Sequence, residues 1–372
     1  MIKLSAATIG LLGVILALLH YAVLPYFDNR LNRVIAANPS PVPAAVRAFH
    51  ESAFVADMHA DSLLWGRDLG QRHRRGHADL PRLRAGGVDL QVYSAVTRVP
   101  WGLNYDSNPS DSDSLPLLFI GAWRSPATWF DPKQRALAQA DELSRLAVTL
   151  VLRRGDLSAD GHKGLLSLEG MHALGGREAA LGEFHTAGYR MMGLAHFFDN
   201  EIAGSAHGRE KYGLTALGRR LIPRMEALGI TIDLAHASPA AFAETLTLAR
   251  KPVVVSHGGV AGTCPGARNL SDDQLRGVAR NGGVVGIGYW KGAVCEASLA
   301  GISRAIFYAI GVAGIEHVGL GSDFDGGITA PFDAGGLPQL TAYLLAAGLS
   351  QADVEQLLGA NLRRVLSTNL PD

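Results

Sequence analysis

The sequence predicts a closed barrel of eight parallel strands with helical crossovers, a (β/α)8 TIM barrel, preceded by an apolar N-terminal helix. Short apolar runs that are typical of buried strands alternate with amphipathic stretches along the chain. This alternation implies parallel pairing, and a length of 372 residues accommodates one such barrel. An open doubly wound sheet is the alternative, but no glycine-rich phosphate-binding turn follows the first strand, which disfavours it.

The expected strands, in chain order, cover residues 54–61, 88–96, 164–170, 189–196, 230–236, 252–257, 283–289 and 317–325. Helices are expected between them, for example over residues 214–229 and 271–282. The second of these begins with Ser271 as an N-cap and continues with two acidic residues in its first turn. The stretch from Thr97 to Pro116 is polar and rich in turn formers, so we expect a loop beside the mouth of the barrel.

The N-terminal segment differs from the rest of the chain. Residues 4–27 form an apolar run in which His20 is the only strongly polar side chain. About 20 apolar residues cross the hydrocarbon core of a bilayer, so we expect a transmembrane anchor over residues 1–27. A linker over residues 28–47 and a catalytic domain over residues 48–372 would follow. A cleaved signal peptide is the alternative, although its apolar stretch is usually shorter.

The net charge and the cysteines limit which partners the protein can have and in which cellular compartment it can lie. The formal net charge is zero, so we expect no nucleic-acid partner. Lys3 favours a cytoplasmic amino terminus, although Arg30 and Arg33 on the other flank weaken that preference. We expect a membrane-anchored protein with its catalytic domain in the periplasm or outside the cell. There Cys264 and Cys295 could form one disulfide, and two free buried thiols are the alternative.

Potential metal ligands lie at the ends of most expected strands. They are Asp57, His59 and Asp61 on the first strand, then Glu169, His196, His236 and His257, and finally Asp323 and Asp325 on the last. In a barrel of this kind the C-terminal ends of all strands face one site. Burying so many ionisable groups together without a cation would be very unfavourable. The sequence therefore predicts a site for a pair of divalent ions.

Imidazole and carboxylate ligands favour zinc, with manganese, iron or cobalt as alternatives. His59 and Asp61 are two residues apart on one strand face and can bind one ion together. Glu169 could bridge two ions, and His236 with His257 could hold the second. Two such ions would polarise a carbonyl and lower the pKa of a shared water. This chemistry predicts a hydrolase that uses water as its nucleophile.

Other polar residues near the strand ends receive less specific interpretations. Asp323, on the last strand, could accept the proton of the water and deliver it to a leaving group. Asp57 and Asp325 could orient the metal ligands or could bind backbone amides, and both alternatives stay open. A serine hydrolase is disfavoured because the sequence has no G-x-S-x-G elbow, and strand alternation would put Ser256 and His257 on opposite faces.

Seven short motifs occur along the chain in a fixed order. They read DMHAD, SLEGMHAL, MMGLAHFFDNEIAGSAHG, GITIDLAHAS, VVVSHGG, GARN and GLGSDFDG. These motifs resemble those of the membrane (renal) dipeptidase family of binuclear zinc metallopeptidases, from about residue 50 to the C-terminus. IDLAHxS and GSDFDG are specific, whereas DxHxD alone also suits other amidohydrolase-type barrels. The resemblance implies a (β/α)8 barrel of the metal-dependent hydrolase type that cleaves dipeptides with two zinc ions.

The resemblance also implies a role for each site residue. It assigns His59 and Asp61 to the first zinc, Glu169 to both, His236 and His257 to the second, and Asp323 to proton transfer. His196 would stabilise the tetrahedral intermediate, and Arg268 would pair with the free carboxylate of the substrate. A disulfide between Cys264 and Cys295 and a homodimer are implied as well. Tyr289 lies near the place of a substrate-binding tyrosine of the family, but it aligns only with gaps.

Two other functions stay open. One is a different two-metal amidohydrolase reaction, on an acylated amino acid, a lactone or a β-lactam ring, and the importance of Arg268 would distinguish it. The other is a membrane-tethered binding protein without catalysis. The complete ligand set argues against the second, and a protein purified without bound metal would favour it.

Overall fold

Eight parallel strands form a closed barrel in the computed structural model of the chain, which describes residues 6–35 and 41–372. The barrel strands are β2 (Ala56–Ala60), β3 (Leu90–Val96), β5 (Lys163–Glu169), β6 (Tyr189–Gly193), β7 (Thr231–Asp233), β8 (Val254–Val260), β10 (Val284–Ile287) and β11 (Val318–Leu320). Each strand pairs in parallel with the next, and β11 pairs with β2 to close the ring. The predicted barrel is confirmed, and every barrel strand overlaps its expected range.

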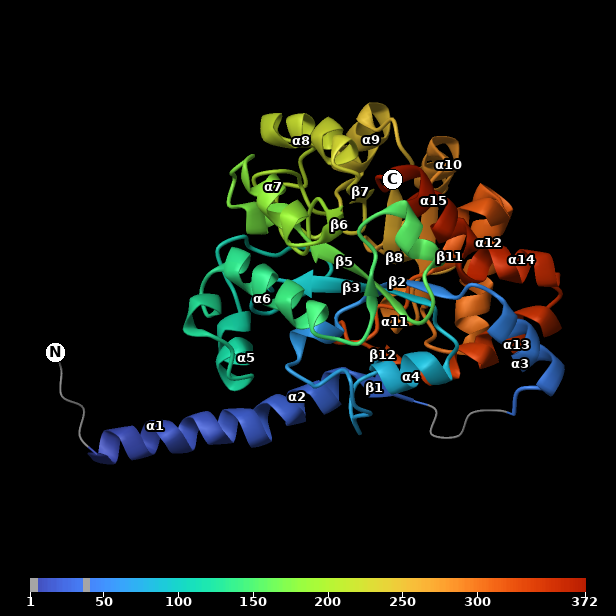
Figure 1. The fold of residues 1–372 in the computed structure, drawn as a ribbon. Helices are drawn as coiled ribbons and strands as arrows, with labels where there is room; N and C mark the ends of the chain where they lie inside the picture. Colours follow the sequence, from blue (N-terminus) through green and yellow to red (C-terminus); the bar gives the residue numbers. More distant parts are fainter. Residues whose placement is uncertain (1–5, 36–40) are drawn as a thin grey trace.

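Helices surround the barrel (Figure 1). They are α3 (Ala44–Ser52), α4 (Leu80–Ala85), α5 (Leu115–Gly121), α6 (Pro132–Ser144), α7 (Ala180–Thr186), α8 (Ala216–Ala227), α9 (Pro239–Leu248), α10 (Asp272–Asn281), α11 (Lys291–Val294), α12 (Leu299–Ala313), α13 (Leu337–Ala346), α14 (Gln351–Glu355) and α15 (Asn361–Asn369). As expected, Ser271 caps α10: its hydroxyl accepts from Gln274 N. The barrel strands are buried on both faces, and this explains why their sequences read as continuous apolar runs.

Within residues 6–35 and 41–372, four short strands lie outside the ring. The strand β4 (Thr149–Leu150) pairs with β5, and β9 (Asn269–Leu270) pairs with β8. A separate two-stranded sheet joins β1 (Arg33–Val34) to β12 (Thr329–Ala330) in parallel. This small sheet ties the start of the chain to the segment that follows the last barrel strand.

A continuous helix opens the described chain. It comprises α1 (Ala6–Leu18), a π-helical turn η1 (Leu19–Val23) and α2 (Leu24–Leu31), and it extends beyond the domain at the lower left of Figure 1. Its stretch Gly10–Leu31, with a mean hydropathy of 1.9, is long and apolar enough to cross a membrane. A signal sequence near the N-terminus passes the same test of length and composition, so these two properties do not distinguish the two alternatives.

The C-terminal half of this helix is packed into the catalytic domain. Leu24 is buried in a cluster with Trp65, Leu115 and Phe119. Asp28 is fully buried, and one of its oxygens accepts a hydrogen bond of 2.7 Å from Arg75 Nε. Removal of this segment by a signal peptidase would therefore expose apolar surface and take one anionic partner from Arg67 and from Arg75.

Residues 28–47 were expected to be a linker, but they are folded where the structure describes them. Asp28 belongs to α2, Arg33–Val34 forms β1, and α3 begins at Ala44. Residues 36–40 of this segment, and residues 1–5 of the expected anchor, lie outside the described residues. The ordered parts of the expected linker pair with distant parts of the chain, which the local sequence does not indicate.

The Asp28→Asn variant should be less stable than the wild type by about 2–4 kcal/mol, because it leaves the buried Arg67 guanidinium with Asp325 as its one remaining anionic partner. Thermal unfolding in detergent micelles would show a midpoint lower by several degrees. Glu51→Gln, at an exposed position of α3, is the control and should leave the midpoint unchanged. An equal midpoint for both variants would show that the packing of α2 contributes nothing to the fold.

Candidate metal centre

Five predicted ligands converge at the C-terminal end of the barrel. Glu169, the last residue of β5, lies at their centre: its Oε1 is 3.1 Å from His236 Nε2, 3.5 Å from His257 Nε2 and 3.5 Å from His59 Nε2. His59 Nε2 is also 3.3 Å from Asp61 Oδ1. Ligand atoms 2.0–2.1 Å from one zinc ion in a tetrahedron are about 3.3 Å apart, so these separations suit a shared metal.

The nitrogen and oxygen atoms that face the centre are arranged as ligands of a cation and not as hydrogen-bond partners of one another. His236 Nε2 and His257 Nε2 are 3.1 Å apart and face each other. Within the described residues, His59 Nε2, Asp61 Oδ1 and Glu169 Oε2 are buried without a hydrogen-bond partner. Two ligand groups share Glu169, namely His59–Asp61–Glu169 and Glu169–His236–His257. The donor set therefore fits two divalent ions with one bridging carboxylate.

Burial shapes the ionisation of this cluster. Burial and the neighbouring Asp61 raise the pKa of Glu169 well above its ordinary value, and burial likewise raises the pKa of Asp61. Burial lowers the pKa of His236 and His257 well below 6.5, so both rings are neutral and have lone pairs to offer. A cation at the centre favours ionised carboxylates and neutral imidazoles, which are the forms that bind metal.

One serine hydroxyl orients two of the histidines that are candidate ligands. Ser256 Oγ donates its only hydrogen to Asp233 Oδ2 (2.5 Å), so it must accept from His257 Nδ1 (2.9 Å) and His59 Nδ1 (3.2 Å). Both rings then carry hydrogen on Nδ1 and present the Nε2 lone pair to the centre. Asp233 is itself held by the amide hydrogens of Ser256 and Ala235.

A β-bulge brings Ser256 and His257 together. Two residues of β8, Ser256 and His257, lie opposite the single residue Gly286 of β10. The bulge breaks strand alternation, so the expectation that these two side chains lie on opposite faces was wrong. Gly286 and Gly321 leave room for the bulge, since a Cβ on either would lie within 2.2 Å of Ser256 O.

A cavity of about 410 Å³ opens onto the candidate metal ligands. Arg268 lines this cavity, and its guanidinium stacks over the Trp290 ring with its centre 5.4 Å from the ring centroid. Within the described chain it donates one hydrogen bond, from Nη2 to His257 O (3.0 Å). Its other N–H groups are thus available to a ligand in the cavity.

Asp323 and His196 also line this cavity. Burial raises the pKa of Asp323 to about 8. His196 Nε2 is 3.6 Å from Glu169 Oε2, and its Nδ1 donates to the carbonyl oxygen of Arg98 (3.2 Å). Burial lowers the pKa of His196 to about 3. The neutral ring therefore has a lone pair on Nε2 and can accept a hydrogen bond there.

The loop after β3 contributes to the wall of the cavity, in agreement with the expected position beside the mouth of the barrel. Leu103, Asn104 and Tyr105 line the cavity wall, and Tyr105 Oη accepts a hydrogen bond of 2.8 Å from Trp290 Nε1. Tyr289, expected at the substrate, lies elsewhere: its side chain is fully buried and its ring contacts Phe324 and Phe332. Its neighbour Trp290 takes the place in the wall that the sequence suggested for Tyr289.

Asp57 and Asp325 fasten the last strand to its surroundings. Asp57 accepts from Ser322 N (2.8 Å) and Ser322 Oγ (2.6 Å). Asp325 accepts from His77 N (2.6 Å) and lies 2.6 Å from Arg67 Nη2. Although burial opposes it, the Arg67 charge holds the pKa of Asp325 well below its usual range. Both carboxylates therefore bind the backbone and neighbouring side chains, one of the two alternatives left open by the sequence.

The structure joins Cys264 and Cys295 in a disulfide, with their Cα atoms 5.3 Å apart. The bridge connects the turn after β8 to the end of α11. It therefore stabilises the part of the wall that presents Arg268 and Trp290.

The comparison with protein families agrees with this geometry. The family described as membrane dipeptidase (peptidase family M19) matches residues 44–370. This chain belongs to that family. A dipeptidase of Aspergillus oryzae, aclJ, is 30% identical over 345 residues, which cover 84% of this chain and 77% of the relative. The resemblance inferred from the motifs is confirmed, and this M19 protein is a metallohydrolase.

Solved structures place this M19 protein among metallopeptidases. The dipeptidase AC, an M19 metallopeptidase, is 26% identical with a TM-score of 0.72 and covers 86% of this chain and 100% of its own. A metallopeptidase from Rhodobacter sphaeroides, liganded with a phosphinate mimic of the dipeptide L-Ala-D-Ala, is 25% identical with a TM-score of 0.69. This match covers 85% of this chain and 99% of the other.

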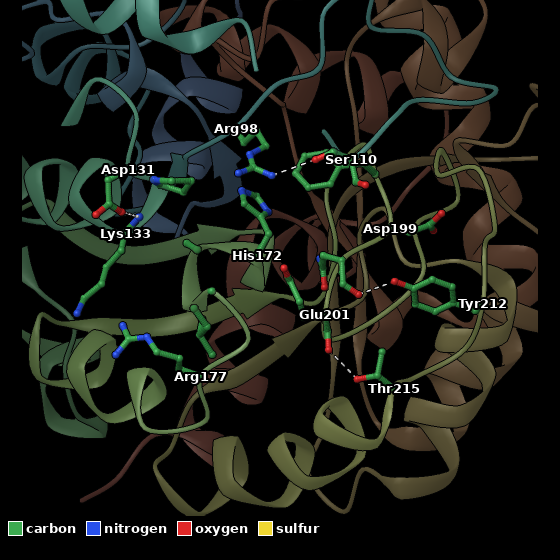
Figure 2. A pocket seen from close by; sticks show the side chains of 16 residues that line it. Arg98, Ser110, Asp131, Lys133, His172, Arg177, Asp199, Glu201, Tyr212 and Thr215 are labelled. Carbon is green, nitrogen blue, oxygen red and sulfur yellow. Dashed lines mark hydrogen bonds between the residues drawn. The ribbon is translucent and has the colours of Figure 1, made fainter. Parts of the chain in front are cut away.

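The M19 protein has a second cavity of about 570 Å³, shown in Figure 2. Arg98 lines this cavity, and its carbonyl oxygen is the acceptor for His196 Nδ1. His172 and Lys133 also lie around it, as Figure 2 shows. The described lining contains none of the predicted site residues, so this cavity is separate from the metal centre.

The Ser256→Ala variant should bind zinc about 10- to 100-fold more weakly, because two ligand rings lose the group that fixes their orientation. Competition with a chromogenic chelator measures this affinity. Ser205→Ala is the matched control, since Ser205 is also a buried serine but bonds to the backbone of His196. An equal affinity for both variants would contradict the orienting role of Ser256.

Proposed function

We propose that this protein is a zinc-dependent dipeptidase for dipeptides with a free C-terminal carboxylate. The observation that carries the proposal is the position of Arg268 in the wall of the metal-lined cavity, with N–H groups available to a ligand. A guanidinium fork suits a carboxylate, and the buried surroundings strengthen that pairing. The Rhodobacter sphaeroides relative, bound to a dipeptide mimic, supports the same substrate class.

We propose that His59, Asp61, Glu169, His236 and His257 hold two zinc ions. The ions would polarise the scissile carbonyl and lower the pKa of the water that attacks it. Asp323 would accept a proton on its carboxylate and deliver it to the departing amine. His196 would contact the reacting amide through Nε2, as an acceptor, because the Arg98 carbonyl fixes its proton on Nδ1. Stabilisation of the tetrahedral oxygen, the role that the resemblance implies, would need a proton on Nε2.

The walls of the cavity indicate which dipeptides fit. Leu103, Tyr105, Phe197, Trp290 and Ile328 supply apolar and aromatic surface around the polar centre. We propose that these residues accept apolar side chains of the substrate, whereas Arg268 fixes its carboxylate end. The loop after β3 contributes two of the five, so its sequence sets part of the preference.

We propose that the N-terminal helix is retained as a membrane anchor and that the catalytic domain lies outside the cytoplasm. The buried contacts of Leu24 and Asp28 support retention of the helix. The disulfide between Cys264 and Cys295 supports an oxidising compartment. The homodimer stays a prediction of the family resemblance.

The Arg268→Met variant tests the substrate class. Its kcat/KM for a free dipeptide should fall roughly 100-fold, mainly through KM, because the carboxylate loses its buried partner. The same dipeptide with a C-terminal amide is the control: the wild type should cleave it slowly, and the variant should cleave it equally slowly.

The full chain in detergent should carry about two zinc ions by elemental analysis. Dipeptide hydrolysis should disappear on chelation and return with zinc. If the protein carries two ions but does not hydrolyse dipeptides, the substrate would instead be a lactone or an acylated amino acid. A wild-type preference for the amide, or a variant with unchanged kinetics, would contradict carboxylate recognition.

A further inference from the structure

An apolar surface lies on the catalytic domain beside the N-terminal helix. The run Leu115–Trp123, which includes α5, contains no charged residue. Its inner face is buried through Leu115 and Phe119, whereas Leu117 is 54% exposed and Trp123 is 55% exposed. Phe130, which follows the next short turn, is 74% exposed. Leu117, Trp123 and Phe130 are called the α5 surface below.

The α5 surface is fixed to the helix that fits a membrane span. The rings of His20 and Trp123 stack with their centroids 3.9 Å apart, and His20 Nδ1 donates to the carbonyl oxygen of Gly121 (2.9 Å). Tyr21 packs edge-on against Trp123 at 5.5 Å. Figure 1 shows α5 directly above the helix, on the side of the domain where the helix departs. Because His20 is packed on this segment, the depth of His20 in or near the membrane also determines the depth of α5.

The length of the helix indicates where His20 and α5 lie relative to the membrane. From Ala6, where the described helix begins, to Leu19, the last residue before the docked His20, the helix rises about 21 Å. The hydrocarbon core of a bilayer is about 30 Å thick. The described part of the helix that precedes His20 is thus shorter than this thickness. The docked residues that follow must lie within the bilayer or at its surface, together with the groups packed on them.

We propose that the α5 surface lies in the interfacial layer of the bilayer, so that the catalytic domain rests on the membrane through α5 as well as through the helix. Trp and Tyr side chains concentrate at this layer, where an apolar ring and a polar tip are both accommodated. Tyr21 and Tyr26 on the helix, 69% and 58% exposed, lie at the same end of the span as Trp123. The inference rests on the anchor proposed above.

Nitroxide labels on the full chain in lipid nanodiscs test the proposal. The two cysteines of the sequence are joined in a disulfide, so a single introduced cysteine is the one free thiol. Leu117→Cys and Phe130→Cys report on the α5 surface, and Val14→Cys reports on insertion of the helix. Leu248→Cys, at a 41% exposed leucine of α9 on the opposite side of the domain, is the matched control. Retained dipeptide hydrolysis shows that each labelled variant is folded.

Collision rates with oxygen and with a water-soluble nickel complex then locate each label. We expect the ratio of oxygen to nickel accessibility to be several-fold higher at positions 14, 117 and 130 than at position 248. A lipid-like ratio at 14 with water-like ratios at 117 and 130 overturns this inference alone. A water-like ratio at position 14 overturns the anchor as well. Shielding from both reagents at 117, with spin–spin broadening, overturns the inference in favour of a second copy covering α5.

Discussion

The Asp323→Asn variant should lose about 10²- to 10⁴-fold in kcat and keep both metal ions. Asp323 lines the cavity beside the ligands, and burial raises its pKa to about 8, so it can gain and release a proton near neutral pH. Asparagine keeps the shape of the side chain but cannot carry a proton through the reaction. Steady-state kinetics with elemental analysis of the same sample separates a lost proton carrier from a lost ligand.

The metal analysis decides between two roles of Asp323. Its carboxylate also forms a possible ligand group with His59 and His257. A variant that retains about one ion instead of two would show that Asp323 binds metal, and the proton-transfer role would then be wrong. Asp106→Asn, at an exposed position in the loop above the cavity, should change neither the kinetics nor the metal content.

The Glu169→Gln variant should lose both ions at micromolar free zinc, and its activity should fall by at least about 10³-fold. Glu169 is the one residue that the two ligand groups share, and its negative charge offsets the charge of both ions. The amide keeps one oxygen but loses that charge, so neither group holds its metal well. Glu201→Gln, at an exposed position after β6, is the control and should bind two ions.

Unfolding measurements provide a second test of the Glu169→Gln variant, because the difference in stability between variant and wild type should change sign when zinc is removed. In the presence of zinc, the wild type should be the more stable protein, because an ion that binds only the folded state stabilises it by mass action. Without metal, the variant should be at least as stable as the wild type, because it no longer buries a carboxylate whose pKa burial raises. A metal-free variant that is less stable than metal-free wild type would show that Glu169 also has a structural role.

The barrel and the position of its ligands could be predicted from the sequence, because both depend on local patterns. Each strand is an apolar run with both faces buried, and the ligands lie at the ends of those runs. Parallel strands bring their C-terminal ends together, so His59, Glu169 and His236 meet although about 180 residues separate the first from the last. The barrel and the meeting of these side chains could therefore be predicted without knowledge of any contact between distant segments.

The features missed by the sequence depend on contacts between distant segments. The bulge in β8 turns Ser256 toward His59 and Asp233, and its only sequence signal is a pair of glycines on neighbouring strands. Asp233 occurs in a recognised motif, yet its role emerges only once Ser256 lies next to it. Likewise, Tyr289 and Trp290 are adjacent in sequence, and the pairing of strand ends decides which one faces the cavity.

The pairing of β1 with β12 has a consequence for biosynthesis. Asn32 Oδ1 accepts from Gly327 N, and these two partners are 295 positions apart. At a synthesis rate of about 5–20 residues per second, the second partner emerges roughly 15–60 s after the first. Until then the segment that contains Asp28 lacks its strand partner, although the cations that pair with Asp28, Arg67 and Arg75, have already been made. The rim that carries Ile328 is completed only when almost the whole chain has been made, so we expect a nascent chain at the membrane to gain hydrolytic activity late and all at once.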